Sequence, residues 1–333
     1  MLKFNEQEII ESVNGALALR EQIEAIIDAL YTQGFDCVCF TGIGGTWASS
    51  LQVESYMRSR TKLSVHVENA AEFITTGNQH FTARSVMIFS SVTGSTEEMV
   101  LAVKKAKAIG ARVFGFIDKA DSELVGLCDF CISYPANEQL KFFMTANYLM
   151  YLNGEFPAYA RCNAEMEAHL AQALAVVEKA ADDFGKAFAE KHHDDIMHYF
   201  VGAGSQWGST YSYAMCYWEE QHWLRSKSIR AEEFFHGMLE IVDCDTPVTV
   251  FLGEDEQRPL AERVAAFLPR ICANYTLIDA KDYADKLEGI SPEFRGSISH
   301  LVTRAVTSRI DAHMEQLNRH PMEIRRYYRK LAY

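Results

Sequence analysis

The chain has 333 residues, 48% hydrophobic and 23% charged, which predicts two ordinary globular domains with buried cores. Its 45 acidic and 32 basic residues give a formal net charge of −13, which argues against binding nucleic acid or an anionic membrane surface. No stretch approaches the roughly 18 uncharged apolar residues of a membrane-spanning helix, and the first residues lack the apolar core of a signal peptide. We therefore expect a cytoplasmic location.

Short apolar runs alternate with amphipathic stretches, a pattern typical of βαβ units around a parallel sheet. The strands predicted in the first half lie at 37–41, 64–67, 86–90, 112–117 and 130–133. Helices are predicted between them at 48–58 and 97–109, and an Ala- and Glu-rich helical stretch follows at 163–191. The elements predicted in the second half are strands at 197–202, 248–252 and 275–278, a helix around 209–225 and a closing helix from about Ser297.

The two halves resemble copies of one unit. The runs FTGIG and FVGAG begin at Phe40 and Phe200, an offset of 160 residues, and two shorter matches recur in the same order at offsets of 162 and 161 residues. Three nearly equal offsets indicate an internal repeat. We therefore predict an α/β fold with two tandem doubly wound, flavodoxin-like domains, each a parallel sheet flanked by helices. The expected domains are 1–160 and 196–333, joined by a bridging helix at 161–195.

A glycine-rich turn follows the first predicted strand and opens a helix. Its sequence is Gly-Ile-Gly-Gly-Thr, from Gly42 to Thr46. Glycines allow a tight turn, and the backbone N–H groups at a helix start favour an anion. The full dinucleotide fingerprint is absent, and no P-loop Lys-Ser/Thr follows, so nucleotide binding is disfavoured.

A hydroxyl-rich loop at 90–96 is the more specific signal for a phosphate. Its hydroxyl groups surround Gly94 and belong to Ser91, Thr93, Ser95 and Thr96. Such a loop can offer several O–H and N–H donors to one phosphate. The alternative, an ordinary Ser/Thr cap with a capping box, stays open. The equivalent stretch of the second half, 253–258, carries three carboxylates that would repel a phosphate, so we expect binding in the first domain only.

Acidic, histidine and tryptophan side chains gather at 218–237, near a predicted helix end and the loop beyond it. His236, in Phe-Phe-His-Gly, is a candidate proton carrier, although a structural histidine or a helix cap fits equally. Glu219 and Glu220 are candidate bases, although they also fit a solvated helix face. Three histidines elsewhere, His192, His193 and His198, lie in the charged bridging stretch and are expected at the surface. No repeated ligand spacing indicates a metal site.

These motifs resemble the SIS (sugar isomerase) family and, within it, the fructosamine 6-phosphate deglycases. The family's catalytic glutamate precedes its catalytic histidine by sixteen positions and the histidine precedes a glycine, a spacing met here by Glu220 and His236. The resemblance places the phosphate contacts on Gly45, Thr46, Ser91, Val92, Thr93 and Thr96. It also suggests substrate contacts for Arg258 and Lys330. It implies no cofactor, and a homodimer or higher homo-oligomer in which His236 can reach a neighbour's site.

The resemblance implies cleavage of a 6-phosphorylated sugar–amino acid adduct, of the fructoselysine or glucoselysine type, into sugar 6-phosphate and a free amino acid. Three alternatives stay open: an aldose–ketose phosphosugar isomerase, an aminosugar-phosphate deaminase and a non-catalytic sugar-phosphate sensor. The expected partner is this small-molecule adduct, with no nucleic acid and no membrane. Neither the amine that leaves nor the sugar type follows from the motifs.

Overall fold

The computed structural model describes residues 1–331, and they form two compact units. The N-terminal unit is Gln7–Ala171, and the C-terminal unit combines residues 1–6 with the chain from Gln172 onward. The division falls within the predicted bridging segment. The domain borders proposed above stay predictions. Among the described residues, no helix is long and apolar enough to cross a membrane.

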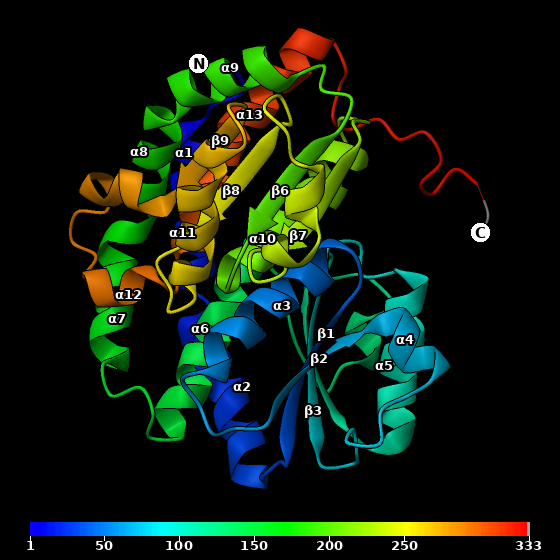
Figure 1. The fold of residues 1–333 in the computed structure, drawn as a ribbon. Helices are drawn as coiled ribbons and strands as arrows, with labels where there is room; N and C mark the ends of the chain where they lie inside the picture. Colours follow the sequence, from blue (N-terminus) through cyan, green and yellow to red (C-terminus); the bar gives the residue numbers. More distant parts are fainter. Residues whose placement is uncertain (332–333) are drawn as a thin grey trace. The chain divides into compact units, whose positions relative to one another are not determined.

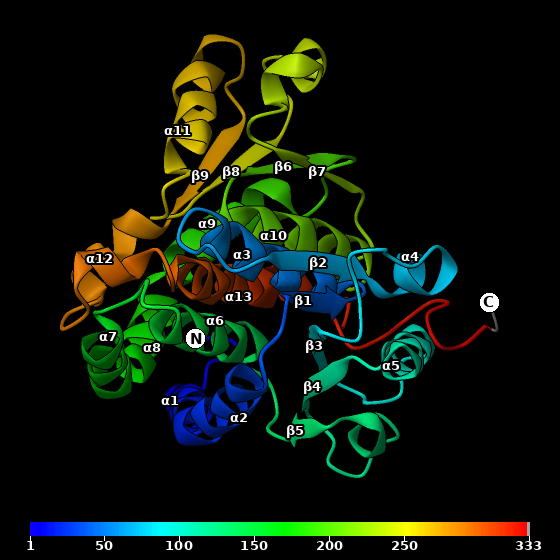
Figure 2. The ribbon, with the colours of Figure 1, turned by 90° about the horizontal axis from the view of Figure 1, so that it is seen from below.

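The N-terminal unit contains a five-stranded parallel sheet in the order β2-β1-β3-β4-β5 (Figures 1 and 2). The strands are β1 (Cys37–Gly42), β2 (Val65–Asn69), β3 (Ser85–Ser91), β4 (Arg112–Ile117) and β5 (Phe130–Ile132). The helices are α1 (Glu6–Leu17), α2 (Arg20–Gln33), α3 (Gly45–Arg58), α4 (Ala70–Thr75), α5 (Glu97–Ile109), α6 (Glu138–Leu152) and α7 (Tyr159–Glu165). A π-helical turn, Met166–Leu170, follows α7.

Helices cover both faces of this sheet, which explains why β1 and β3 are buried along their whole length. On one face, Cys39 and Met87 pack into a core with Phe73 of α4 and Met99 of α5. On the other face, Phe40 and Phe116 pack against Phe142 of α6. Figure 2 shows α4 and α5 on the side of the sheet opposite α2 and α6.

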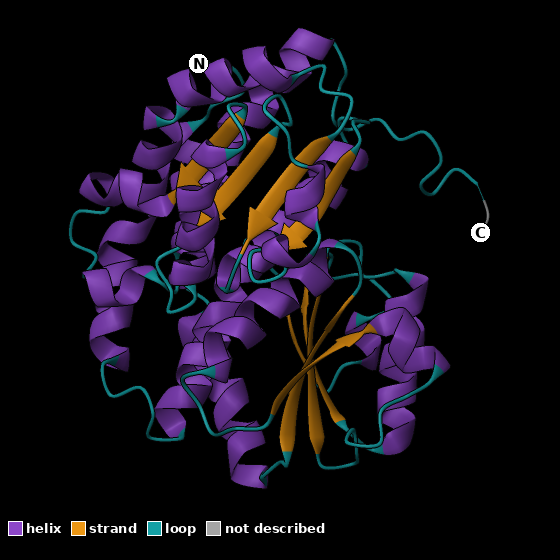
Figure 3. Ribbon diagram, in the orientation of Figure 1, coloured by secondary structure: helices purple, strands orange, loops and turns teal. Residues whose placement is uncertain are grey.

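The C-terminal unit contains a four-stranded parallel sheet in the order β7-β6-β8-β9 (Figure 1), whose strands are the upper orange arrows in Figure 3. The strands are β6 (His198–Gly202), β7 (Ser226–Arg230), β8 (Val248–Leu252) and β9 (Tyr275–Asp279). The helices are α8 (Ala171–Ala180), α9 (Asp182–His192), α10 (Ser205–Ser212), α11 (Arg258–Phe267), α12 (Pro292–Arg295) and α13 (Ser299–Asn318). A π-helical turn, Tyr213–Glu219, continues α10.

The predicted fold class is confirmed, since residues 1–331 contain two parallel sheets, of five and four strands, flanked by helices. One local prediction is wrong: the chain from Ser226 to Arg230, expected to be part of a loop, is the edge strand β7. Its sequence, SKSIR, carries one large apolar residue, and its side chains are half-buried or exposed. Pairing with β6, and not a local apolar pattern, makes this segment a strand.

Candidate functional site

The loops after the neighbouring strands β1 and β3 lie at the carboxyl edge of the N-terminal sheet. From β1 the chain proceeds to β2 on one side, whereas β3 lies on the other side of β1. This reversal is the topological switch point, where open α/β sheets bind their ligands. Both phosphate-binding segments predicted from the sequence therefore lie at the position that this fold uses for ligands.

The glycine-rich turn places the N-terminus of α3 directly after β1. A Cβ atom on Gly42 would lie 2.5 Å from the carbonyl carbon of Thr46 and the nitrogen of Trp47, so only glycine allows this close approach. Gly44, the residue before the helix, has φ +62°. The hydroxyl of Thr46 accepts from the N–H of Ile43 at 3.2 Å and donates to its carbonyl at 3.0 Å, which rigidifies the turn.

The hydroxyl-rich loop joins β3 to α5. The buried Ser91 accepts a hydrogen bond through Oγ from the N–H of Gly94 at 3.1 Å. Gly94 has φ +63°, and a Cβ atom there would lie 1.9 Å from Ser122 Oγ, so the turn requires glycine. Thr93 and Thr96 place their hydroxyl oxygens 3.5 Å apart.

Thr96 is the residue before the first turn of α5, yet its side chain makes no capping hydrogen bond. The ordinary alternative for this loop, a Ser/Thr cap, needs that bond. The ordinary cap is therefore not formed at Thr96, and the phosphate contact of its hydroxyl stays a prediction. Val92 is 58% exposed, so only its backbone could contact a phosphate.

A group of charged side chains that the sequence analysis missed lies beside the start of α3. Ser49 Oγ donates to Glu138 Oε1 at 2.5 Å, and the fully buried Lys141 donates to the carbonyl of Tyr134 at 2.8 Å. Burial raises the pKa of Glu138, against the effects of Ser49 and Lys141. Burial also lowers the pKa of Lys141, whose Nζ lies 3.7 Å from Asp118 Oδ1. None of these residues belongs to a distinctive local sequence motif, so the sequence alone did not reveal the group.

The predicted acid–base segment lies in the C-terminal unit. Glu220 follows the π-helical turn, and its Oε1 accepts a hydrogen bond from Nε of Arg325 at 2.7 Å. The neighbouring Glu219 instead accepts from the hydroxyl of Ser226 at 3.1 Å. His236 is exposed in the short 3-10 helix Phe234–His236. Within residues 1–331, no hydrogen bond or ion pair joins Glu220 to His236, so their joint action stays a prediction.

The two further residues suggested for substrate contact differ in their surroundings. The Arg258 guanidinium donates to both carboxylate oxygens of Asp279, at 2.8 and 2.5 Å, and also to Glu262 and to the carbonyl of Gly253. This arrangement fixes β8, β9 and α11 to one another and favours a structural role. Lys330 lies exposed in the C-terminal segment. A substrate contact stays a prediction for both.

The prediction of surface histidines is wrong for His192 and His198, which are 1% and 0% exposed. Nδ1 of each lies 2.8 Å from Oδ2 of Asp195, and Nε2 of His198 lies 2.8 Å from the hydroxyl of Thr249. Two facing elements, α9 and β6, bury these rings, which their charged sequence neighbourhood did not reveal. Their ligand atoms lie within 4.8 Å of one another and could hold a metal, but they already hydrogen-bond to one another.

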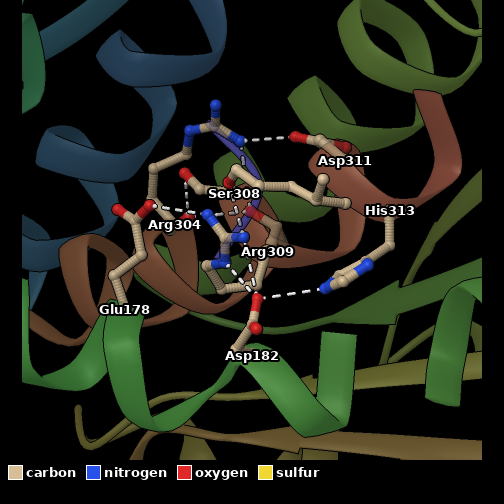
Figure 4. Close-up of polar contacts among 9 residues, drawn as sticks. Glu178, Asp182, Arg304, Ser308, Arg309, Asp311 and His313 are labelled. Atoms are coloured by element: carbon tan, nitrogen blue, oxygen red, sulfur yellow. Dashed lines mark hydrogen bonds and ion pairs between the residues drawn. The ribbon is translucent and has the colours of Figure 1, made fainter. Parts of the chain in front are cut away.

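A cavity of about 400 Å³ lies beside α13 in the C-terminal unit. Its walls include Arg304, which pairs with Asp311 at 2.9 Å, and Arg309, which pairs with Asp182 at 2.8 Å (Figure 4). Arg325, the partner of Glu220, forms another part of the wall. Because each of these cations already has a carboxylate partner, the cavity is not an evident anion site.

Comparison with known proteins shows what the chain is similar to. Residues 36–156 match the SIS domain, and this match spans all five strands of the N-terminal sheet. This part of the chain is therefore similar to the SIS domain, the resemblance that the motifs predicted.

Individual relatives extend this similarity to nearly the whole chain. The chain is 29% identical over 326 residues to fructosamine deglycase FrlB of Bacillus subtilis, covering 95% of this chain and 98% of that protein. It is 27% identical over 277 residues to fructoselysine 6-phosphate deglycase of Escherichia coli, covering 81% and 80% of the two chains. The predicted similarity to deglycases is confirmed, and the chain is an enzyme.

Solved structures support the same fold. The crystal structure of a phosphosugar isomerase candidate from Bacillus subtilis matches with a TM-score of 0.89 and 25% identity, covering 96% of this chain and 99% of that one. A similarly described protein of Salmonella typhimurium matches with a TM-score of 0.86 and 23% identity, covering 94% and 99%. The second similarity shows the fold alone.

Proposed function

We propose that this enzyme, of the phosphosugar deglycase or isomerase class, cleaves a 6-phosphorylated sugar–amino acid adduct into sugar 6-phosphate and a free amino acid. The observation that carries the proposal is the hydroxyl-rich loop 91–96 at the switch point of the N-terminal sheet. Its hydroxyl and N–H groups suit the phosphate of such a substrate. The deglycase relatives favour the adduct over a simple sugar phosphate.

The phosphate anchor supplies binding energy away from the bond that breaks. Ser91, Thr93 and Thr96 hold the phosphate, with the backbone of Gly45, Thr46 and Val92 as further donors. Because the phosphate is fixed at one end of the sugar, the carbon atoms at the other end are held for proton transfer.

The reaction begins with a ketose adduct whose C1 carries the amine. Glu220 removes a proton from C1 of the open-chain sugar, and a proton returns to C2, which leaves a Schiff base between C1 and the nitrogen. Water adds to C1, the C–N bond breaks, and the aldose phosphate and the free amine leave. His236 opens the ring and exchanges protons with the oxygen and nitrogen atoms that change charge.

This chemistry requires no electron transfer, and the residues named supply each proton step. The oligomeric state of the enzyme is part of the same proposal. We expect a homodimer or higher homo-oligomer in which His236 of one copy serves a neighbour's substrate.

The test is to incubate the purified protein with fructoselysine 6-phosphate and to measure glucose 6-phosphate and lysine. We expect both products in equal amounts, and a loss of roughly 1,000-fold or more in kcat for Glu220→Gln. Glu219→Gln is the matched control, because Glu219 is the adjacent carboxylate and hydrogen-bonds to Ser226 instead of Arg325. Equal activity of Glu220→Gln and wild type would remove Glu220 as the base.

A second set of substrates separates the alternatives. Turnover of glucoselysine or fructose-aspartate 6-phosphates, but not of fructoselysine 6-phosphate, would assign a different amine or sugar to the substrate and leave the proposed mechanism unchanged. Interconversion of aldose and ketose phosphates without adduct cleavage would indicate an isomerase. Release of ammonia from an aminosugar phosphate would indicate a deaminase. Phosphosugar binding without turnover of any of these would indicate a sensor.

A further inference from the structure

The segment after α13 contacts the turn that carries Glu220. The imidazole of His320 lies 4.2 Å from the ring of Trp223, between centroids, and the guanidinium of Arg326 lies 4.4 Å from the same ring. Arg325 lies between these two residues in the chain and donates through Nε to Glu220 Oε1 at 2.7 Å. Three contacts therefore hold the segment against one turn of the candidate site.

The guanidinium of Arg325 is itself fixed by its own segment. Its NH1 group donates to the carbonyls of Met322 at 2.6 Å and Ile324 at 3.0 Å. These bonds leave Nε directed at the carboxylate, and the planar guanidinium makes that direction rigid. The side chain is 23% exposed, compared with 35% for that of Glu220.

The turn that receives Arg325 has a backbone conformation that few side chains adopt. Trp223 has φ +59°, in the left-handed region, although it is neither glycine nor asparagine. The N–H groups on either side, of His222 and Leu224, bond back to the carbonyls of Tyr217 and Trp218 at 2.8 and 2.9 Å. Such local strain persists only where the surroundings impose it, and it is concentrated at functional sites.

We propose that Arg325 is a positioning residue for Glu220, holding one carboxylate oxygen so that the other is presented to the substrate. This inference rests on the proposed function, in which Glu220 is the base. The contact engages Oε1 and orients the carboxylate plane. A base held in one orientation reacts faster than one that rotates freely, because the reacting geometry is already formed.

The same contact is a weak candidate for a purely structural role. Ion pairs between partly exposed side chains contribute little to folding, so losing one changes stability only slightly. Glu220 and Arg325 are both partly exposed. A large effect on turnover with little effect on Tm is therefore the signature that separates positioning from structural support.

The experiment compares Arg325→Ala and Arg325→Lys with wild type, using the phosphorylated adduct. Arg325→Ala is expected to lower kcat roughly 10- to 100-fold with KM and Tm nearly unchanged. Arg325→Lys retains the charge but not the planar guanidinium group, so its kcat should lie between those of wild type and Arg325→Ala. Millimolar guanidinium should partly restore the kcat of Arg325→Ala and leave wild type unchanged. Arg329→Ala removes the same charge from the same segment and should behave as wild type.

The outcomes also separate this inference from the proposed function. If wild type cleaves the adduct, Glu220→Gln does not, and Arg325→Ala has wild-type or higher kcat, then Arg325 does not position the base and the proposed function stands. If Arg325→Ala lowers Tm together with kcat, and guanidinium restores neither, the contact is structural only. If wild type turns over no phosphorylated adduct or sugar, the proposed function fails and the role of Arg325 fails with it.

Discussion

The carboxylate of Asp255 accepts two hydrogen bonds from Ser205, from its backbone N–H at 2.7 Å and from its hydroxyl at 2.6 Å, both through Oδ2. Ser205 begins α10, which is the counterpart in the second half of the helix that follows the glycine-rich turn Gly42–Thr46. An internal carboxylate therefore occupies the anion position of the C-terminal unit. This arrangement supports the expectation that a phosphate binds only in the N-terminal unit.

Asp255→Ala is expected to destabilise the C-terminal unit by about 1–3 kcal/mol, because it leaves the helix start without its buried acceptor. Asp255 is 8% exposed, so water cannot readily reach the helix start to accept the hydrogen bonds that the carboxylate accepted. Urea unfolding followed by circular dichroism measures the change. Asp245→Ala, at an exposed acidic position nearby in the sequence, is the control and should change stability by less than about 0.5 kcal/mol.

Thr96→Val is expected to raise KM for the phosphorylated substrate by roughly 10- to 100-fold and to leave kcat within a few-fold. The substitution keeps the side-chain shape and removes one hydroxyl from the proposed phosphate site, which weakens ground-state and transition-state binding alike. Steady-state kinetics give both constants. Competitive inhibition by inorganic phosphate should weaken in parallel. Ser95→Ala, in the same loop but not assigned a phosphate contact, should leave both measurements near wild type; an equal effect there would argue against the assigned contacts.

The His192–Asp195–His198 group should make the C-terminal unit sensitive to acid. Burial lowers the pKa of His198 to about 4, although its hydrogen bond to Asp195 opposes the shift. Burial alone would raise the pKa of Asp195, but hydrogen bonds from the two imidazoles lower it to about 2. His198 therefore stays neutral in the folded protein at pH values where it is protonated in the unfolded chain.

The sign of the effect follows from proton binding. As the pH falls from about 6.5 to about 4, the unfolded chain gains a proton that folded His198 does not accept, so stability decreases. The loss attributable to His198 is on the order of 3 kcal/mol. Asp195 adds a further loss as the pH falls from about 4 towards 2. Urea unfolding at several pH values gives the free energy of unfolding as a function of pH. Between about pH 6.5 and pH 4 this free energy should fall less steeply for His198→Asn than for wild type, and an equal fall would contradict the assignment.

Cys131 should be alkylated at neutral pH, with a rate that rises around pH 7. A hydrogen bond from Cys128 lowers the pKa of the Cys131 thiol to about 7, against the effect of burial, while the pKa of Cys128 is raised. The thiolate is the reactive form, so the rate follows its ionisation. Mass spectrometry after timed iodoacetamide treatment measures labelling at each position. Cys128→Ser replaces the neighbouring thiol and should shift the pH at which the alkylation rate of Cys131 is half-maximal. An unchanged midpoint would show that Cys128 does not cause the lowered pKa.

Several features of the protein were accessible from local sequence alone. The alternation of apolar runs and amphipathic stretches predicted eight of the nine strands in the described part of the chain, because burial between two layers of helices imposes an apolar pattern on a strand. The helix at 97–109 was predicted with the bounds that the structure shows. The hydroxyl-rich loop was recognisable because its donors are neighbours in the chain.

Other features depend on residues that are distant in the sequence, and only the tertiary structure decided them. The strand β7 forms because β6 offers a pairing edge, not because its own residues are apolar. His192 and His198 are buried because α9 and β6 meet, although their neighbours in the chain are charged. Arg325 meets Glu220 across 105 residues. A local pattern encodes which face of an element is buried, whereas the identity of its partner depends on chain topology and packing.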